Sequence, residues 1–310
     1  MLMLVTICVL TYQRPEGLQR LIHGLNQLTF SRIPQPEIHV AVVDNDKAGA
    51  ASEFCEQAKP GFKWALTCVV ESQRGISYAR NRAIAAASPS SDFIVFIDDD
   101  EIPDPAWLEE LLIVQSTHNA DVVHGRVIPH FQDDVPAWVI KGKFFEQHRY
   151  ATGHALEAAY TNNVLVRATL LNQQEKAFDE RFALTGGEDS YFFRTLHHQG
   201  HSLIWADDAV VYESIPPSRT TMQWILLRAY RSCLTYTIWE KEAKPTIVTK
   251  IVSVAKAIAQ IITGLFLIPF SLMMDRHVLA RALLHLYKGV GRFSGLIGIS
   301  YQEYRTIHGS

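Results

Sequence analysis

A short apolar segment that ends in four consecutive carboxylates constrains this chain more than any other feature. Phe93–Ile97 are apolar and mostly β-branched or aromatic, which predicts a strand buried on both faces. Asp98-Asp99-Asp100-Glu101 follow with no basic residue among them. Like charges this close repel one another unless a cation lies between them, and carboxylate oxygens are ligands that Mg²⁺ and Mn²⁺ prefer. We therefore expect a site for a metal ion and a phosphate at the end of this strand.

The direction of each carboxylate follows from the geometry of an extended chain. Successive side chains alternate, so Asp98 and Asp100 are predicted to point one way and Asp99 the other. The alternative is an acidic loop that caps the next helix, because Asp104-Pro105 resembles an N-cap followed by proline. Since that cap accounts for Asp104 but not for the triplet, we favour the metal site.

Strand and helix patterns alternate over the first two-thirds of the chain. Predicted strands cover residues 2–10, 37–43, 64–70, 93–97 and 120–127, and predicted helices cover 15–28, 48–58, 76–88 and 104–117. This alternation predicts an α/β fold with a mostly parallel sheet and helices on both faces. Ligands of such sheets bind beyond the carboxyl ends of the strands. The predicted polar cleft therefore combines four strand ends, Thr11–Pro15, Asp44–Asp46, Glu71–Gly75 and Asp98–Asp100.

Regular patterns are less continuous after residue 128. Residues 128–160 show no clear period, and a run this long is expected to be a functional lid rather than a linker. Short strands are predicted at 162–167, 202–206 and 209–213, and a helix at 219–240.

A second polar constellation lies at Gly186-Gly187-Glu188-Asp189, directly before a predicted helix that ends near Gln199. Glycines here allow the backbone to approach a ligand closely, and Asp189 is expected to face the same cleft. The alternative for Asp189 is a carboxylate that only stabilises the helix dipole. Arg80 and Asn81, in the first two turns of an earlier helix, can face a phosphate or a carboxylate, or form a surface salt bridge.

The C-terminal part differs in composition. Residues 257–274 carry no charge, which is near the length of about 18–20 residues that a membrane span needs. Residues 278–300 place Arg281, Lys288 and Arg292 among leucines and isoleucines, as interfacial helices do. We expect membrane contact here, and the alternative is a helix pair packed on the main domain.

Composition and missing motifs exclude several functional classes. A net charge of −3 gives no electrostatic argument for nucleic-acid binding. The four cysteines, Cys8, Cys55, Cys68 and Cys233, form no CxxC pair, which argues against structural zinc and disulfides and fits a reducing compartment. The sequence has no HExxH, GxSxG or GxxxxGK[ST] motif, so it does not support zinc-protease, serine-hydrolase or P-loop functions.

Five motifs in fixed order give the chain a family resemblance. They are Thr11-Tyr12-Gln13-Arg14-Pro15, Val43-Asp44-Asn45, Gly75 with Ala79-Arg80-Asn81, Asp98-Asp99-Asp100 and Gly187-Glu188-Asp189. Over residues 1–235 the chain resembles family 2 glycosyltransferases with the GT-A fold. Its tail, with Lys288-Gly289, Gly291-Arg292, Gly295-Leu296 and Glu303-Tyr304-Arg305, is similar to bacterial exopolysaccharide transferases of the succinoglycan type.

The resemblance implies an inverting transfer from a nucleotide-diphosphate sugar, usually a UDP-sugar, with a divalent cation, Mn²⁺ or Mg²⁺. By that likeness Asp189 is the general base, with Glu188 beside it, and Asp100 and Asp98 hold the metal. The donor is then bound by Thr11, Tyr12, Arg14, Asp44, Arg80, Asp98, Asp99, Gly187, Arg228 and Arg231. A base opposite the leaving group and a metal at the diphosphate are what a single inverting displacement requires.

Two positions depart from the patterns of the family. Many relatives place a histidine after the last strand as a further metal contact, whereas Glu213 follows Val211-Tyr212 here. The QxxRW motif of processive polysaccharide synthases is replaced by Gln223-Trp224 with Arg228 following. We therefore expect one sugar to be transferred per encounter.

The sequence thus predicts a GT-A catalytic domain at 1–240 and a helical, membrane-associated segment at 241–310. The expected acceptor is a lipid-linked saccharide of bacterial surface polysaccharide synthesis, at the cytoplasmic side of the inner membrane. One alternative is a nucleotidyltransferase, although Thr11–Pro15 lacks the glycines of such enzymes. The others are a non-catalytic nucleotide- or saccharide-binding protein and a two-metal hydrolase, for which histidines at metal-ligand spacing are missing.

Overall fold

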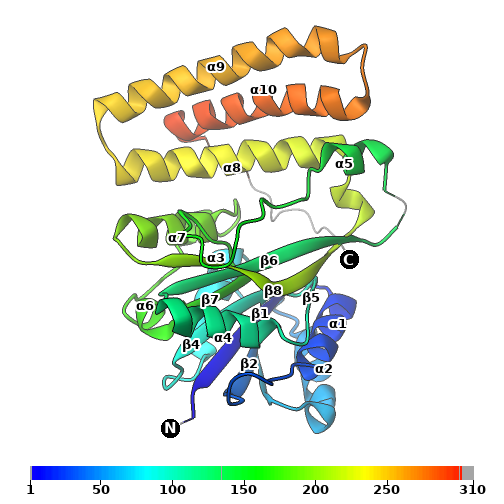
Figure 1. The fold of residues 1–310 in the computed structure, drawn as a ribbon, viewed down its shortest axis with the longest axis vertical. Helices are drawn as coiled ribbons and strands as arrows, with labels where there is room; N and C mark the ends of the chain where they lie inside the picture. Colours follow the sequence, from blue (N-terminus) through cyan, green and yellow to red (C-terminus); the bar gives the residue numbers. More distant parts are fainter. Residues whose placement is uncertain (1, 134, 300, 302–310) are drawn as a thin grey trace.

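One mixed sheet of eight strands organises the structure, a computed structural model that describes residues 2–133, 135–299 and 301 (Figure 1). The strands are β1 (Leu4–Thr11), β2 (Glu37–Asp44), β3 (Ala65–Val70), β4 (Phe93–Asp98), β5 (Glu101–Pro103), β6 (Val122–Phe131), β7 (Asn163–Arg167) and β8 (Leu203–Ile215). Their order across the sheet is β3-β2-β1-β4-β7-β6-β8-β5. The tail motif Glu303-Tyr304-Arg305 and Ser300 lie outside the described residues.

The half of the sheet formed by β3, β2, β1 and β4 is parallel throughout, as predicted. The helices that connect or follow these strands are α1 (Pro15–Asn26), α2 (Ala50–Ala58) with η1 (Lys59–Gly61), α3 (Ile76–Ala86) and α4 (Trp107–His118). One apolar core lies between the sheet and α1, α2 and α4, and a second lies between the sheet and α3, α6 (Ala168–Asn172) and α7 (Glu188–His198). Helices therefore cover both faces, which confirms the predicted α/β fold.

The other half of the sheet departs from the predicted pattern. β7 pairs antiparallel with both β4 and β6, so it runs in the opposite direction to these two neighbouring strands. The two strands predicted at 202–206 and 209–213 are one strand, β8, whose pairing with β6 shifts register between Gly125 and Arg126. This β-bulge accommodates Asp207-Asp208, the polar pair that made the sequence look interrupted. β5, which pairs antiparallel with β8, was not predicted.

The predicted cap of α4 is also wrong. The helix begins at Trp107, with Ala106 rather than Asp104 as its N-cap residue. Asp104 instead accepts a hydrogen bond from the Ala106 backbone N–H at 3.0 Å, in the turn between β5 and α4. The sequence Asp104-Pro105 therefore marks the turn and not the first residues of the helix.

Among the residues described between β6 and β7, the only helix is the short α5 (Ala137–Gly142). The later part of this segment is tied to β8 by backbone hydrogen bonds from Gly153 to Trp205, from Trp205 to His154 and from Leu156 to Leu203. These bonds make residues 153–156 an extension of the sheet, so this part of the predicted lid is a fixed wall.

Three long helices form a separate layer above the sheet (Figure 1). After η2 (Glu180–Phe182) and η3 (Pro217–Arg219) come α8 (Met222–Ala243), α9 (Ile247–Ser271) and α10 (Arg276–Ile297), with α10 between α8 and α9. Glycines allow this close packing: a Cβ on Gly291 would collide with the Tyr230 carbonyl oxygen of α8. Arg292 is buried and paired with Glu240 at 3.5 Å, so it does not belong to the basic surface predicted for α10.

α9 presents most of its apolar side chains to the outside of the structure. It is the one helix among the described residues that is long and apolar enough to cross a membrane by length and composition, with a mean hydropathy of 2.1 and only 17% of its most apolar window buried. The exposed side chains include Ile251, Ile258, Ile262, Leu265, Phe266 and Phe270. Such an apolar surface is larger than isolated surface leucines explain.

Candidate active site

A cavity of about 950 Å³ lies at the carboxyl ends of β1 and β4 and extends to α8. It receives side chains from segments far apart in the sequence, including the loop after β1, the turn after β4, the N-terminus of α7 and one face of α8. The predicted site residues that line it are Thr11, Tyr12, Arg14, Arg80, Asp98, Asp99, Asp100, Gly187, Glu188, Asp189, Arg228 and Arg231.

Asp44 is the predicted site residue that is not among those lining the cavity. Its side chain is buried, and its two carboxylate oxygens accept hydrogen bonds of 2.9 Å from the backbone N–H groups of Asp46 and Ala51. The carboxylate therefore shapes the turn after β2. The next residue, Asn45, lines the cavity and fixes the loop before α3 through its hydrogen bond with the Gly75 N–H.

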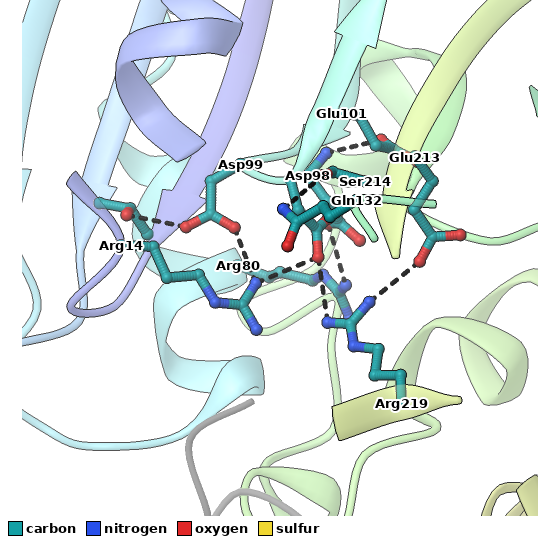
Figure 2. A network of polar contacts seen from close by, with 11 residues as sticks. Arg14, Arg80, Asp98, Asp99, Glu101, Gln132, Glu213, Ser214 and Arg219 are labelled. Carbon is teal, nitrogen blue, oxygen red and sulfur yellow. Dashed lines mark hydrogen bonds and ion pairs between the residues drawn. The ribbon is translucent and has the colours of Figure 1, made fainter. Parts of the chain in front are cut away.

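The acidic triplet forms a turn, so the predicted alternation of its side chains is wrong. β4 ends at Asp98, and Asp99 and Asp100 lie in the turn before β5. Arg14 contacts both of them, with Nη1 at 3.0 Å from Asp99 and 3.3 Å from Asp100, and Thr11 donates a 2.8 Å hydrogen bond to Asp99 (Figure 2). Asp99 is thus held inside the protein by groups from the β1 end.

Two further side chains complete this network from the other half of the sheet. Glu213 lies on β8, and Arg219 donates from its two terminal nitrogens to Glu213 and to Asp100, each at 3.0 Å (Figure 2). Glu101 is buried beside Asp98 and accepts a 2.9 Å hydrogen bond from the Asp98 backbone N–H. Five carboxylates therefore gather where β4, β5 and β8 meet.

Burial, and to a smaller extent the neighbouring carboxylates, raises the pKa of three of these groups. Burial, together with the charges of Asp100, Asp99 and Glu213, raises the pKa of Asp98 to about 7, although Arg80 opposes this. Burial and Asp100 raise the pKa of Asp99 to about 6, and burial raises the pKa of Glu101 well above its usual range. A further cation would relieve this repulsion.

The residues present fit a divalent cation. Among the residues that the structure describes, no three His, Cys, Asp or Glu side chains are already arranged as a metal-ligand cluster. However, the Asp98 side chain keeps 38% of its surface accessible and lines the cavity beside Asp100. Hard carboxylate oxygens that carry surplus negative charge suit Mg²⁺ or Mn²⁺ with open coordination positions for phosphate oxygens.

Arg80 links the acidic turn to α7. Its side chain is buried, forms an ion pair with the buried Glu188 and lies 4.0 Å from Asp98. This pairing holds Glu188 away from solvent and sets the position of α7 relative to β4. The neighbouring Asn81 does not face the cavity, because its side chain exchanges hydrogen bonds with the Phe178 backbone.

Asp189 lies in the first turn of α7 and faces the cavity. Its carboxylate accepts from the Ser190 N–H at 2.6 Å and, at 3.5 Å, from the backbone N–H and hydroxyl of Thr161. Gly187 precedes the helix with φ of +93°, and a Cβ there would lie 2.5 Å from the Thr235 hydroxyl oxygen on α8. Glycine is therefore required for α7 to approach α8 this closely.

Trp138 and Trp224 have different surroundings. Trp138 is buried in the apolar cluster between α5 and α10. Trp224 lines the cavity, but its ring is stacked on Phe145 with centroids 5.7 Å apart, and Arg228 lies 5.3 Å from its centroid. Trp138 therefore belongs to the packing of the helical layer.

Sequence reasoning missed the contacts of Arg219 and the structural role of Asn163. Asn163 is fully buried on β7, where its side chain accepts from the Trp107 indole at 2.7 Å and donates to the backbone carbonyls of Arg126 and Ala209. It therefore fastens three strands and α4 beside the site. No local pattern marks either residue, since their partners are distant in sequence.

Comparisons of the sequence with family models and with known proteins agree with each other. The family model described as "Glycosyl transferase family 2" matches residues 6–173. The succinoglycan biosynthesis protein ExoM of Rhizobium meliloti is 30% identical over 75% of this chain and 74% of its own length.

Two solved structures share the fold. The mannosyltransferase PcManGT of Pyrobaculum calidifontis, solved with GDP-Man and Mn²⁺, has a TM-score of 0.64 at 17% identity and covers 94% of this chain and 86% of that one. Residues 1–349 of S. aureus TarS, solved with UDP, have a TM-score of 0.54 at 18% identity. The match covers 97% of this chain and 93% of that one.

The buried Arg80–Glu188 pair allows a prediction about stability. Glu188→Ala is expected to lower the free energy of unfolding by about 3–5 kcal/mol, because it leaves Arg80 buried without this partner. Replacing both residues with apolar ones, Arg80→Met with Glu188→Leu, is expected to recover most of that loss. Urea denaturation measures both. Glu180→Gln, which breaks the exposed pair with Lys176, is the control and should change stability by no more than about 1 kcal/mol. An equal loss of unfolding free energy in Glu188→Ala and in the control would contradict the assignment of a buried Arg80–Glu188 ion pair.

Proposed function

Because the chain belongs to glycosyl transferase family 2 and is a glycosyltransferase that uses nucleotide-sugar donors, we propose that it transfers one sugar per encounter, with inversion, to a saccharide acceptor. Family membership sets aside the nucleotidyltransferase, hydrolase and non-catalytic alternatives. The relationship to a succinoglycan biosynthesis protein favours a role in bacterial surface polysaccharide synthesis. The donor we propose is a UDP-sugar.

One observation carries this proposal: a single cavity contains both the acidic turn after β4 and Asp189 at the start of α7. The first group suits a diphosphate and a cation, and the second suits the removal of a proton from an acceptor hydroxyl. The cavity volume of about 950 Å³ is at the upper end for small-molecule sites, so a donor and an acceptor group fit in it together. Tyr12 and Arg74, whose guanidinium lies 5.0 Å from the Tyr12 ring, would hold the nucleotide at the β1 end.

Asp98 and Asp100 would hold the divalent cation. When bound, the cation neutralises charge that develops on the departing nucleoside diphosphate. Arg14 and Arg219 already contact Asp100, so they keep its carboxylate in place and add positive charge near the diphosphate. Thr11 and Arg14 hold Asp99 in the turn, which positions its two neighbours.

Asp189 would accept the proton of the acceptor hydroxyl. The Thr161 and Ser190 N–H groups orient its carboxylate at the start of α7. Because Arg80 neutralises Glu188, Asp189 is the carboxylate of this pair that remains available to the acceptor. Glu188 then acts by positioning Arg80.

We further propose that residues 1–240 form the catalytic part and 241–310 associate with the inner face of the membrane. The exposed apolar surface of α9 supports this, and the exposed Arg281 and Lys288 on α10 add positive charge for anionic headgroups. An acceptor linked to a lipid fits an enzyme held at that surface.

Donor binding can be tested by thermal unfolding with UDP and other nucleoside diphosphates, each with and without Mn²⁺. A ligand at a hundred times its dissociation constant is expected to stabilise the chain by about 2.7 kcal/mol. We expect this increase only when Mn²⁺ is present, and we expect Asp100→Ala to abolish it. Asp208→Ala, which removes an exposed carboxylate outside the cavity, should leave the increase intact. A Mn²⁺-independent shift would contradict the metal assignment.

The role of Asp189 can be tested with Asp189→Asn. Loss of a general base is expected to lower kcat for transfer by about 10²–10⁴-fold. The stabilisation by UDP and Mn²⁺ should remain, because the donor site is unchanged. Release of UDP in the presence of a saccharide acceptor measures kcat, and Ser190→Ala is the neighbouring control. Turnover within threefold of the unaltered chain would contradict this assignment.

Membrane association can be tested by sedimentation with vesicles of phosphatidylethanolamine and phosphatidylglycerol. Phe266 and Phe270 are 67% and 61% exposed on α9, so the double variant Phe266→Asp with Phe270→Asp is expected to remove most of the bound fraction. Leu2→Asp, at a position 69% exposed, is the matched control and should bind as the unaltered chain does. Binding by the double variant equal to that of Leu2→Asp would overturn the proposal.

A further inference from the structure

A row of aromatic rings lines one wall of the cavity, and the mechanism above does not use it. The residues are His148, Tyr150, His154, Trp205, His124 and Tyr160. Successive ring centroids lie close: 4.4 Å for His148–Tyr150, 4.3 Å for Tyr150–His154, 5.8 Å for Tyr150–Trp205, 5.6 Å for His124–Trp205 and 5.7 Å for His124–Tyr160. Each ring therefore contacts the next, and we call this set of six rings the aromatic wall.

The aromatic wall has a buried base and an exposed front. Trp205 and His124 are each 3% exposed and come from β8 and β6, so the sheet fixes them. Tyr160 is 41% exposed, and His154 is also exposed, although both line the cavity. A large aromatic ring left open inside a cavity offers apolar area to a ligand.

The wall is rigid. Backbone hydrogen bonds tie residues 153–156 to β8. Asp207, in the β-bulge, accepts from Arg149 at 2.8 Å and from the Trp205 indole at 3.4 Å, and its own N–H donates to the Thr152 hydroxyl. A ligand binds to a preformed surface of this kind without the entropic cost of ordering a loop.

The position of the wall assigns it to the acceptor and not to the nucleotide. Tyr160 directly precedes Thr161, whose backbone N–H and hydroxyl donate to Asp189 at 3.5 Å, so this end of the wall lies beside the proposed base. Tyr12 and Arg74 line the cavity at the β1 end, where we place the nucleotide. Burial lowers the pKa of His124 to about 4, so this ring at the base of the wall is neutral.

We propose that the aromatic wall is the acceptor subsite, where the C–H face of a pyranose ring packs on Tyr160 and His154 while one of its hydroxyl groups reaches Asp189. This inference rests on the proposed function, since it names the acceptor of that same site. A pyranose has an apolar C–H face and a polar edge, so an aromatic surface beside a carboxylate matches both parts. Tyr160 and His154 then determine acceptor binding and act at no step of donor binding.

Saturation-transfer NMR on the full chain with UDP and Mg²⁺ tests this subsite. The probes are the methyl β-glycosides of glucose, galactose, mannose and N-acetylglucosamine. We expect at least one glycoside to receive saturation on the protons of one ring face. Tyr160→Ala and His154→Ala should each reduce that signal at least threefold, whereas Tyr160→Phe should keep it because the ring remains. Tyr212→Ala is the matched control, since Tyr212 is 40% exposed and outside the cavity.

Stabilisation by UDP separates failure of the subsite from failure of the proposed function. Signals that are unchanged in both Tyr160→Ala and His154→Ala, in proteins that UDP still stabilises, would overturn the subsite and leave the donor site standing. The absence of any glycoside signal from the unaltered chain that UDP stabilises would also overturn it. Absence of stabilisation by UDP or any other nucleoside diphosphate would overturn the donor site on which both proposals rest.

Discussion

Repulsion among the carboxylates at the end of β4 is the constraint on which the rest of the site depends. Three arginines offset it, and each comes from a different place: Arg14 precedes α1, Arg80 lies on α3, and Arg219 precedes α8. Each arginine therefore ties a separate connection of the fold to the same turn (Figure 2). Burial, opposed by Arg80, raises the pKa of Asp98 to about 7, and the proposed cation would add further positive charge at this turn.

β7 runs antiparallel between β4 and β6, and the strands on its two sides bring two kinds of surface to one cavity. The parallel half supplies strand ends that follow the usual rule for ligand binding in α/β sheets. The mixed half supplies β6 and β8, whose side chains His124 and Trp205 form the base of the aromatic wall. The side chain of Asn163 on β7 bonds to β6 and β8, and its backbone lies opposite Ile97 of β4, so this residue is next to both halves. The charged end, where we propose the donor, and the aromatic end, where we propose the acceptor, thus follow from the same topology.

Local patterns predicted the parts of the fold that local interactions determine. The buried strands β1, β2 and β4 follow from apolar runs, and the position of Asp189 beside the acidic turn follows from the order of the motifs. The bulge in β8, the antiparallel direction of β7 and the partners of Arg219 could not be predicted. They depend on contacts between residues far apart in the sequence, such as Arg219 with Asp100. The position of Asp44 outside the cavity could not be predicted either, because its carboxylate accepts hydrogen bonds from two backbone N–H groups.

One helix connects the cavity to the helical layer. Arg228, Arg231 and Thr235 lie at helical spacing and line the cavity. On another side of the same helix, the backbone of Tyr230 and Leu234 contacts glycines of α10 so closely that a Cβ would not fit. α10 in turn packs on α9, whose outer face is apolar. Because interlocked backbones leave little room for sliding, the proposed membrane surface has a fixed position relative to Asp189. A lipid-linked acceptor would then be presented to the aromatic wall from one direction, which restricts the hydroxyl groups that can reach the base.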